Sequence, residues 1–178
     1  MVIFWRAMWK DWGFAPSLFA QAKQFLDLAT HADGSAQEGY VRASIVFALM
    51  SFEAYWRDVI TGYIQANGAT VDQSRLTKVK KEMARTDLKK ALERWPQILV
   101  GTPLDTSAKV YDDFSNFREY RNFLVHGRIS EPIRSSWGKL AQEIETLECA
   151  ELAQSTVSEM INMVARHFGY SLPAWAVV

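Results

Sequence analysis

Apolar residues recur at helical spacing along nearly the whole chain, and no stretch alternates convincingly between apolar and polar residues as a half-buried strand does. The clearest stretch is 35–67, which reads as one long helix closed by Asn67 and Gly68. One face of this helix carries Val41, Ile45, Ala48, Leu49, Phe52, Trp56, Val59 and Tyr63. The pattern therefore predicts an all-α fold.

The remaining apolar stripes place further helices on both sides of this long one. They predict helices over about 18–31, 73–95, 106–126 and 147–168. Residues 127–145 contain Pro132 and Gly138 and read as a loop with room for one short helix. Together, the predicted helices form a four- to five-helix bundle with mostly short connections.

Composition places this bundle among soluble globular proteins. The chain has 178 residues, 49% of them hydrophobic and 22% charged, which suits one domain with a real core. Cys149 is the only cysteine, so no internal disulfide forms and a reducing cytoplasmic location is expected. The N-terminus lacks a signal-peptide layout, and no stretch approaches the length of a membrane span, so no membrane partner is expected.

Three tryptophans share one stripe in the first segment of the chain. Trp5, Trp9 and Trp12 fall at i, i+4 and i+7, in a helix that would end at Gly13 and Pro16. We therefore divide the chain into a tryptophan-rich segment, 1–16, and a single helical bundle, 17–178. The stripe is expected to pack on the bundle or on a second subunit, and anchoring at a membrane surface is the alternative.

The predicted helix 73–95 carries most of the local positive charge. It holds eight lysines and arginines against three acidic residues, in a chain whose formal net charge is zero. Such a run is either a solvated helix surface or a surface that attracts phosphate. If it attracts phosphate, the residues expected to contact RNA are Lys78, Lys81, Arg85 and Lys89.

An arginine lies inside the apolar sector of the helix predicted for 106–126. At about 100° per residue, Arg121 falls in the middle of a sector that also holds Phe114, Phe117 and Leu124. A buried guanidinium is costly unless it is paired, so Arg121 needs a carboxylate partner or must line a cleft. Glu53, at the edge of the apolar face of the long helix, is the candidate partner. Arg118 lies at the edge of the sector and is expected to be less constrained.

His126 follows at the predicted end of the same helix, just before Gly127. Asn122 lies four residues earlier and therefore shares a face with it, so the amide can orient the imidazole. His126 is about 140° around the helix from Arg121, so their positions on a helical wheel do not show that the two side chains converge. Histidine is the side chain best suited to proton transfer near neutral pH, although a histidine at a helix end is also a common cap.

The sequence RNFLVHG, at residues 121–127, resembles the signature of the HEPN superfamily. That signature is an arginine, a polar residue directly after it, and a histidine four to six positions later. An all-α context and an upstream helix reading SFEAYWRDVI agree with it, so that the resemblance extends over about residues 35–168. It implies a metal-independent ribonuclease, often a toxin or defence component, that needs no cofactor and acts as a homodimer.

Site roles follow from the same resemblance. Arg121 would hold the scissile phosphate, Asn122 would position substrate or His126, and His126 would transfer protons at the ribose 2′-OH or the leaving oxygen. Cleavage through the 2′-OH benefits from both a base and an acid, while one chain offers one well-placed histidine. A two-fold axis beside this helix would supply a second His126.

The rival interpretation is a dimeric helical module without chemistry, which binds RNA, a nucleotide or a protein partner such as an antitoxin. Some members of the superfamily are of that kind. In this case Arg121 and Glu53 form a structural pair and His126 is a cap. The two interpretations differ in whether Arg121 and His126 face one open cleft. A metal hydrolase is not expected, because His31, His126 and His167 lie on separate predicted elements without an HExxH-type pair.

Overall fold

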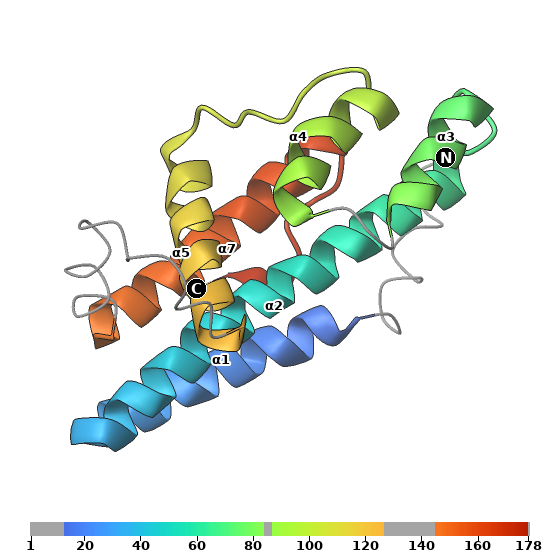
Figure 1. Cartoon of the computed structure of the whole chain (residues 1–178). Helices are drawn as coiled ribbons and strands as arrows, with labels where there is room; N and C mark the ends of the chain where they lie inside the picture. Colours follow the sequence, from blue (N-terminus) through green and yellow to red (C-terminus); the bar gives the residue numbers. More distant parts are fainter. Residues whose placement is uncertain (1–12, 84–86, 127–144, 178) are drawn as a thin grey trace.

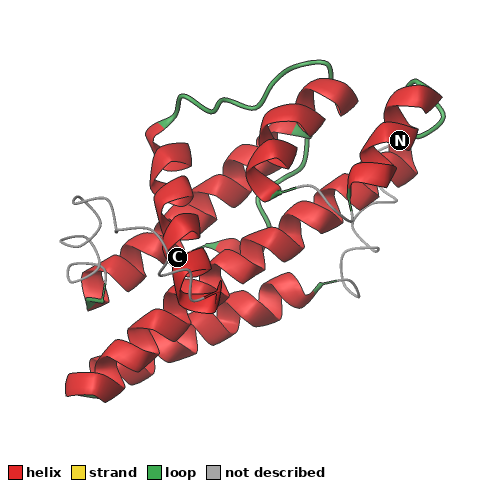
Figure 2. Ribbon diagram, in the orientation of Figure 1, coloured by secondary structure: helices red, strands yellow, loops and turns green. Residues whose placement is uncertain are grey.

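The computed structural model describes residues 13–83, 87–126 and 145–177, and every regular element in these ranges is a helix (Figure 2). The described elements are α1 (Phe14–Thr30), α2 (Gly34–Asn67), α3 (Gln73–Glu82), α4 (Leu88–Leu99), α5 (Lys109–His126), α7 (Leu147–His167) and the short 3-10 helix η3 (Ala174–Ala176). The predicted all-α fold class is confirmed. The predictions for the tryptophan stripe and for the loop 127–144 lie outside the described residues.

The long helix α2 is the centre of the molecule. It runs for 34 residues and packs on α1, α5 and α7 (Figure 1). Its predicted face is buried throughout except for Tyr63, which is half-buried. Phe52 meets Phe114 of α5 with their ring centroids 4.5 Å apart, and Trp56 meets Phe168 at 5.9 Å. One helix thus sets the positions of α5 and α7 relative to each other.

The helix α7 follows its predicted range closely, whereas α1 begins about four residues earlier than predicted and runs through Pro16, where the preceding helix was expected to end. α1 begins at Phe14, directly after Gly13, so Pro16 lies in its first turn, where the missing N–H has no intrahelical partner to lose. Its buried stripe includes Phe19, whereas Leu18 and Phe25 are only half-buried. In α7, one stripe of apolar residues is buried together with Phe168, which follows the helix: Ala153, Val157, Met160, Ile161 and Val164.

The single helix predicted for 73–95 is wrong. Asp87 has the extended backbone of a helix N-cap, and its carboxylate accepts a hydrogen bond from Lys89 N at 2.9 Å, so α4 starts anew after it. The predicted stop at Trp95 and Pro96 is also wrong, because α4 continues through Pro96 to Leu99. Trp95 stacks on Trp56 at 6.2 Å and Leu99 is buried, which offsets the backbone bond that proline removes.

A buried glutamine joins three of the helices. Gln154 of α7 donates to the backbone oxygen of Ala22 in α1 at 3.1 Å and to Ser44 Oγ in α2 at 3.0 Å. Near the chain end, Trp175 of η3 packs edge-on against Phe19 and Tyr55. In the part of the chain that the structure describes, no helix is both long and apolar enough to cross a bilayer.

Candidate functional site

Arg121 lies where α5 crosses α2, and it contacts the predicted partner. Its Nη2 is 3.4 Å from Glu53 Oε2, and the two side chains are 18% and 30% exposed. The pair is therefore neither enclosed in the core nor free on the surface. Part of the Arg121 side chain is therefore in contact with solvent.

The guanidinium also contacts its neighbour in the sequence. Nη1 of Arg121 donates to Asn122 Oδ1 at 3.1 Å. Its Nε is enclosed and has no hydrogen-bond partner among the described residues. A guanidinium has five N–H donors, so with Nε enclosed these two contacts leave one N–H on each of Nη1 and Nη2 for an anionic ligand. Because Asn122 presents its oxygen to Arg121, its NH2 group is available to donate elsewhere.

His126 is the last residue of α5, as predicted. Its side chain lies outside the described residues, so its convergence with Arg121 stays a prediction. The same holds for the orientation of His126 by Asn122.

Arg118 is paired with a different carboxylate from Arg121, and the expectation that it is less constrained than Arg121 is wrong. Its guanidinium binds the carboxylate of Asp87, the N-cap residue of α4, and its side chain is only 13% exposed. The helix wheel of α5 did not reveal this because Asp87 belongs to a different helix. The ion pair instead fastens the start of α4 to the middle of α5, about one helical turn before Arg121.

The predicted RNA-contacting residues divide between two places. Lys78 and Lys81 are exposed on α3, which lies beside the C-terminal end of α2 (Figure 1). At 1.5 Å per residue, that end of α2 is about 21 Å from Glu53. Lys89 is exposed in the first turn of α4, two residues after the Asp87 that binds Arg118, and is thus much closer to Arg121. Arg85 lies outside the described residues.

A second polar link holds α5 to α2 and to the start of α7. Arg42 of α2 binds Glu145 through Nε and Nη2, at 2.8 and 2.6 Å. Tyr120, the residue before Arg121, donates its hydroxyl to Glu145 Oε1 at 3.2 Å. The hydrogen bonds from Arg42 hold the pKa of the Glu145 carboxyl below its usual range. This network fixes the rotation of α5 beside the candidate site.

A hollow of about 590 Å³ lies between the start of α1 and the stripe of α2 that carries Glu53. We call it the Phe14 hollow; its walls include Phe14, Leu18, Met50, Glu53, Arg57 and Asp58. Burial raises the pKa of the Asp58 carboxyl. Phe14, Arg57 and Asp58 were not predicted as site residues from the sequence, although the spacing of Met50, Glu53 and Arg57 places these three on one helical stripe.

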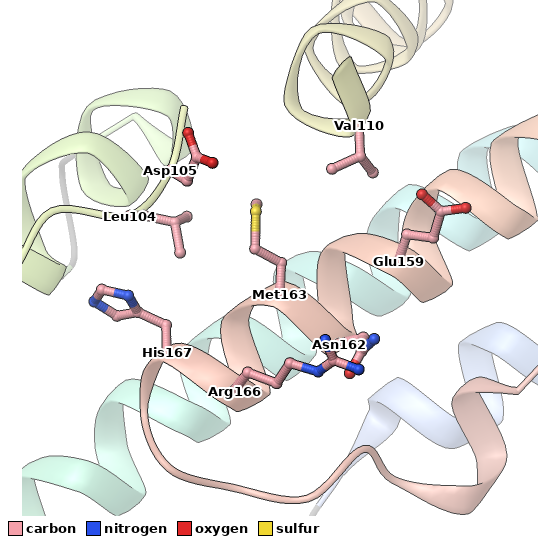
Figure 3. A pocket seen from close by; sticks show the side chains of 8 residues that line it. All are labelled: Leu104, Asp105, Val110, Glu159, Asn162, Met163, Arg166 and His167. Atoms are coloured by element: carbon pink, nitrogen blue, oxygen red, sulfur yellow. The ribbon is translucent and has the colours of Figure 1, made fainter. Parts of the chain in front are cut away.

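A different groove, of about 620 Å³, opens along the outer face of α7. Figure 3 shows Met163 rising from α7 in its middle, between Leu104 and Val110. Nε2 of His167 is enclosed here and has no hydrogen-bond partner among the described residues. Asp105 is already engaged, because its carboxylate accepts from both N and Oγ of Ser107. None of the predicted site residues lines this groove.

Comparison with known proteins gives no further guidance to the family. No protein-family model, no curated protein and no solved structure matches this chain.

Proposed function

We propose that this chain is a HEPN-like, metal-independent endoribonuclease that acts as a homodimer. The observation that carries the proposal is the state of Arg121. Its guanidinium contacts Glu53 and Asn122, its side chain is 18% exposed, and it lies five residues before His126, which ends α5. An immobilised arginine with unused donors suits a phosphate, which it can bind through two parallel hydrogen bonds.

The chemistry assigns one task to each residue. A base removes the proton of the ribose 2′-OH, and the 2′-oxygen attacks the adjacent phosphorus. The bond from phosphorus to the 5′-oxygen breaks, and an acid protonates the leaving oxygen. His126 and the His126 of a second copy take these two proton transfers. Arg121 stabilises the negative charge that develops on the phosphoryl oxygens. The products are a 2′,3′-cyclic phosphate and a 5′-hydroxyl.

Glu53 keeps Arg121 in place between turnovers. A lone guanidinium at this depth would be costly, and the carboxylate lowers that cost. The closest approach of 3.4 Å is long for a charge-assisted hydrogen bond, so a phosphate competes for the same donors on favourable terms. Lys89, in the first turn of α4, adds positive charge two residues after the Asp87 that binds Arg118.

The second candidate is a helical module that binds RNA, a nucleotide or a protein partner without cleaving RNA. It is favoured by the same ion pair, because Glu53 already neutralises Arg121 and the pair links α2 to α5 as a purely structural contact would. In this case the homodimer and a partner such as an antitoxin remain compatible with the fold.

The nuclease proposal is tested with a chimeric RNA. A fluorescent RNA is first cut by the protein to locate the cleaved bond, and the same RNA is then made with a single 2′-deoxy residue before that bond. We expect cleavage at that bond to disappear while cleavage at other bonds continues, and the original products to end in 2′,3′-cyclic phosphate. Unchanged cleavage of the deoxy-substituted bond would overturn the mechanism.

A further inference from the structure

The Phe14 hollow shares a residue with the Arg121 site. Glu53 lines the hollow and also contacts Nη2 of Arg121. An occupant of the hollow that touches Glu53 is therefore one side chain away from the guanidinium to which the phosphate is assigned. The hollow and the phosphate site could then hold two parts of the same nucleotide, or of neighbouring nucleotides.

The polar wall of the hollow offers hydrogen-bond acceptors. No group among the described residues donates a hydrogen bond to Asp58, and Glu53 receives only the long contact from Arg121. Asp58 is half-buried on this wall, and burial raises the pKa of its carboxyl. Ionised carboxylates accept and do not donate, so the fitting ligand presents N–H groups.

The other wall offers a surface for stacking. Phe14 is 82% exposed, an unusual state for a phenylalanine, and it stands beside Leu18 and Met50 at the mouth of the hollow. Arg57 is exposed on the same stripe of α2. Aromatic rings and guanidinium planes are the two surfaces on which proteins stack unpaired bases.

We propose that the Phe14 hollow binds one unpaired base of RNA and prefers bases that carry an amino group. Phe14 stacks on the base, and Asp58 accepts a hydrogen bond from the exocyclic amine, as carboxylates do from the amino group of cytosine. The proposal rests on the RNA-binding part of the proposed function. A free polyamine suits the hollow less well, because Arg57 opposes a second positive charge and Phe14, Leu18 and Met50 form an apolar wall.

The test measures binding without cleavage. Short 2′-O-methyl oligonucleotides carry no free 2′-OH, and three of them are compared by fluorescence anisotropy at low salt: oligocytidylate, oligouridylate and an oligomer of N4,N4-dimethylcytidine. Cytosine and uracil have nearly the same shape but exchange donor and acceptor, and the dimethylated base keeps its ring without an N–H. We expect the wild type to bind oligocytidylate about tenfold more tightly than either of the others.

Two variants test the polar wall and the stacking wall of the Phe14 hollow separately. Asp58→Asn is expected to reduce the cytidine preference to about threefold or less. Phe14→Ala is expected to weaken binding of oligocytidylate and oligouridylate alike, by about tenfold, and to leave their ratio unchanged. Asp27→Asn and Leu28→Ala, both on the exposed face of α1, are the matched controls and should bind as the wild type does.

Equal binding of cytidylate and uridylate by the wild type would overturn the proposal, as would absence of binding or an unchanged preference in Asp58→Asn. The outcome is separable from that of the nuclease assay. A cytidine preference without any cleavage would retain the base site and reject the nuclease. Cleavage without a base preference would retain the nuclease and reject the base site.

Discussion

Arg121 of α5 and Glu53 of α2 form an ion pair whose nearest atoms, Nη2 and Oε2, lie 3.4 Å apart at the crossing of the two helices. The pair has two roles at once. It neutralises a guanidinium that lies on the buried side of α5, and it borders the Phe14 hollow through Glu53. The stability of the bundle and the candidate site therefore share a residue, and substitutions at Glu53 or Arg121 must be tested for both.

Glu53→Gln is expected to lower the free energy of unfolding by about 1–2 kcal/mol. The figure lies between those of exposed and buried pairs, because both side chains keep some contact with water. Urea unfolding at pH 7 measures it. Adding Arg121→Met to the variant should recover part of the loss, since no unpaired charge then remains. An unchanged unfolding midpoint in Glu53→Gln would mean that Arg121 needs no partner.

Gln154→Leu is expected to destabilise the fold by about 1–3 kcal/mol, because the change leaves the buried hydroxyl of Ser44 without its donor. Gln154 is 2% exposed and Ser44 is 0% exposed, so water cannot take over the bond. Thermal unfolding compares this variant with Gln24→Leu, which changes an exposed residue of α1. Equal melting temperatures for the two variants would show that the link between α7 and α2 contributes nothing.

Glu145→Gln is expected to destabilise the protein at pH 7, and this effect should fade as the pH falls through the lowered folded-state pKa of Glu145. Arg42 lowers the folded-state pKa of Glu145, so its stabilisation is complete above the unfolded-state value of 4.5 and is lost as the pH falls through the lower folded-state value. Unfolding free energies of wild type and variant at several pH values test this. A difference between the two proteins that stays constant with pH would contradict the assigned cause.

Asp58→Asn is expected to stabilise the protein at pH 7 while it weakens the cytidine preference. Burial raises the folded-state pKa of Asp58, so the folded state is favoured below the unfolded-state value of 3.8 and loses that advantage as the pH rises through the folded-state value. An amide removes the burial cost of the charge. Differential scanning calorimetry at pH 7 should show a higher melting temperature than for the wild type, and a lower one would mean that the charge itself stabilises the fold.

The helices with long, regular stripes could be predicted from the sequence. The face of α2 from Val41 to Val59 lies in the core because its spacing leaves only one orientation that buries it. The boundary between α3 and α4 could not be found this way. Basic residues continue across this boundary in the sequence. Asp87 is the N-cap of α4, but an aspartate in such a run can equally be an exposed residue inside one continuous helix.

The candidate site was only partly predictable for a related reason. Glu53 was found because a buried Arg121 needs a carboxylate partner and Glu53 lies at the edge of the apolar face of α2. The partner of Arg118 was missed because Asp87 approaches from α4, and a helix wheel contains no information on other helices. The Phe14 hollow depends likewise on how α1 starts against α2, a tertiary relationship.

The most direct test of the nuclease is cleavage of several RNAs in EDTA by the wild type, His126→Ala and His31→Ala. His31 is an exposed histidine at the end of α1, so its variant controls for the loss of any histidine and for contaminating nucleases. All three proteins are first shown to be folded and of the same oligomeric state. We predict that wild type and His31→Ala cleave and that His126→Ala does not. Equal cleavage by all three would contradict the assignment of His126, and absence of cleavage by the wild type would leave the noncatalytic module as the better account.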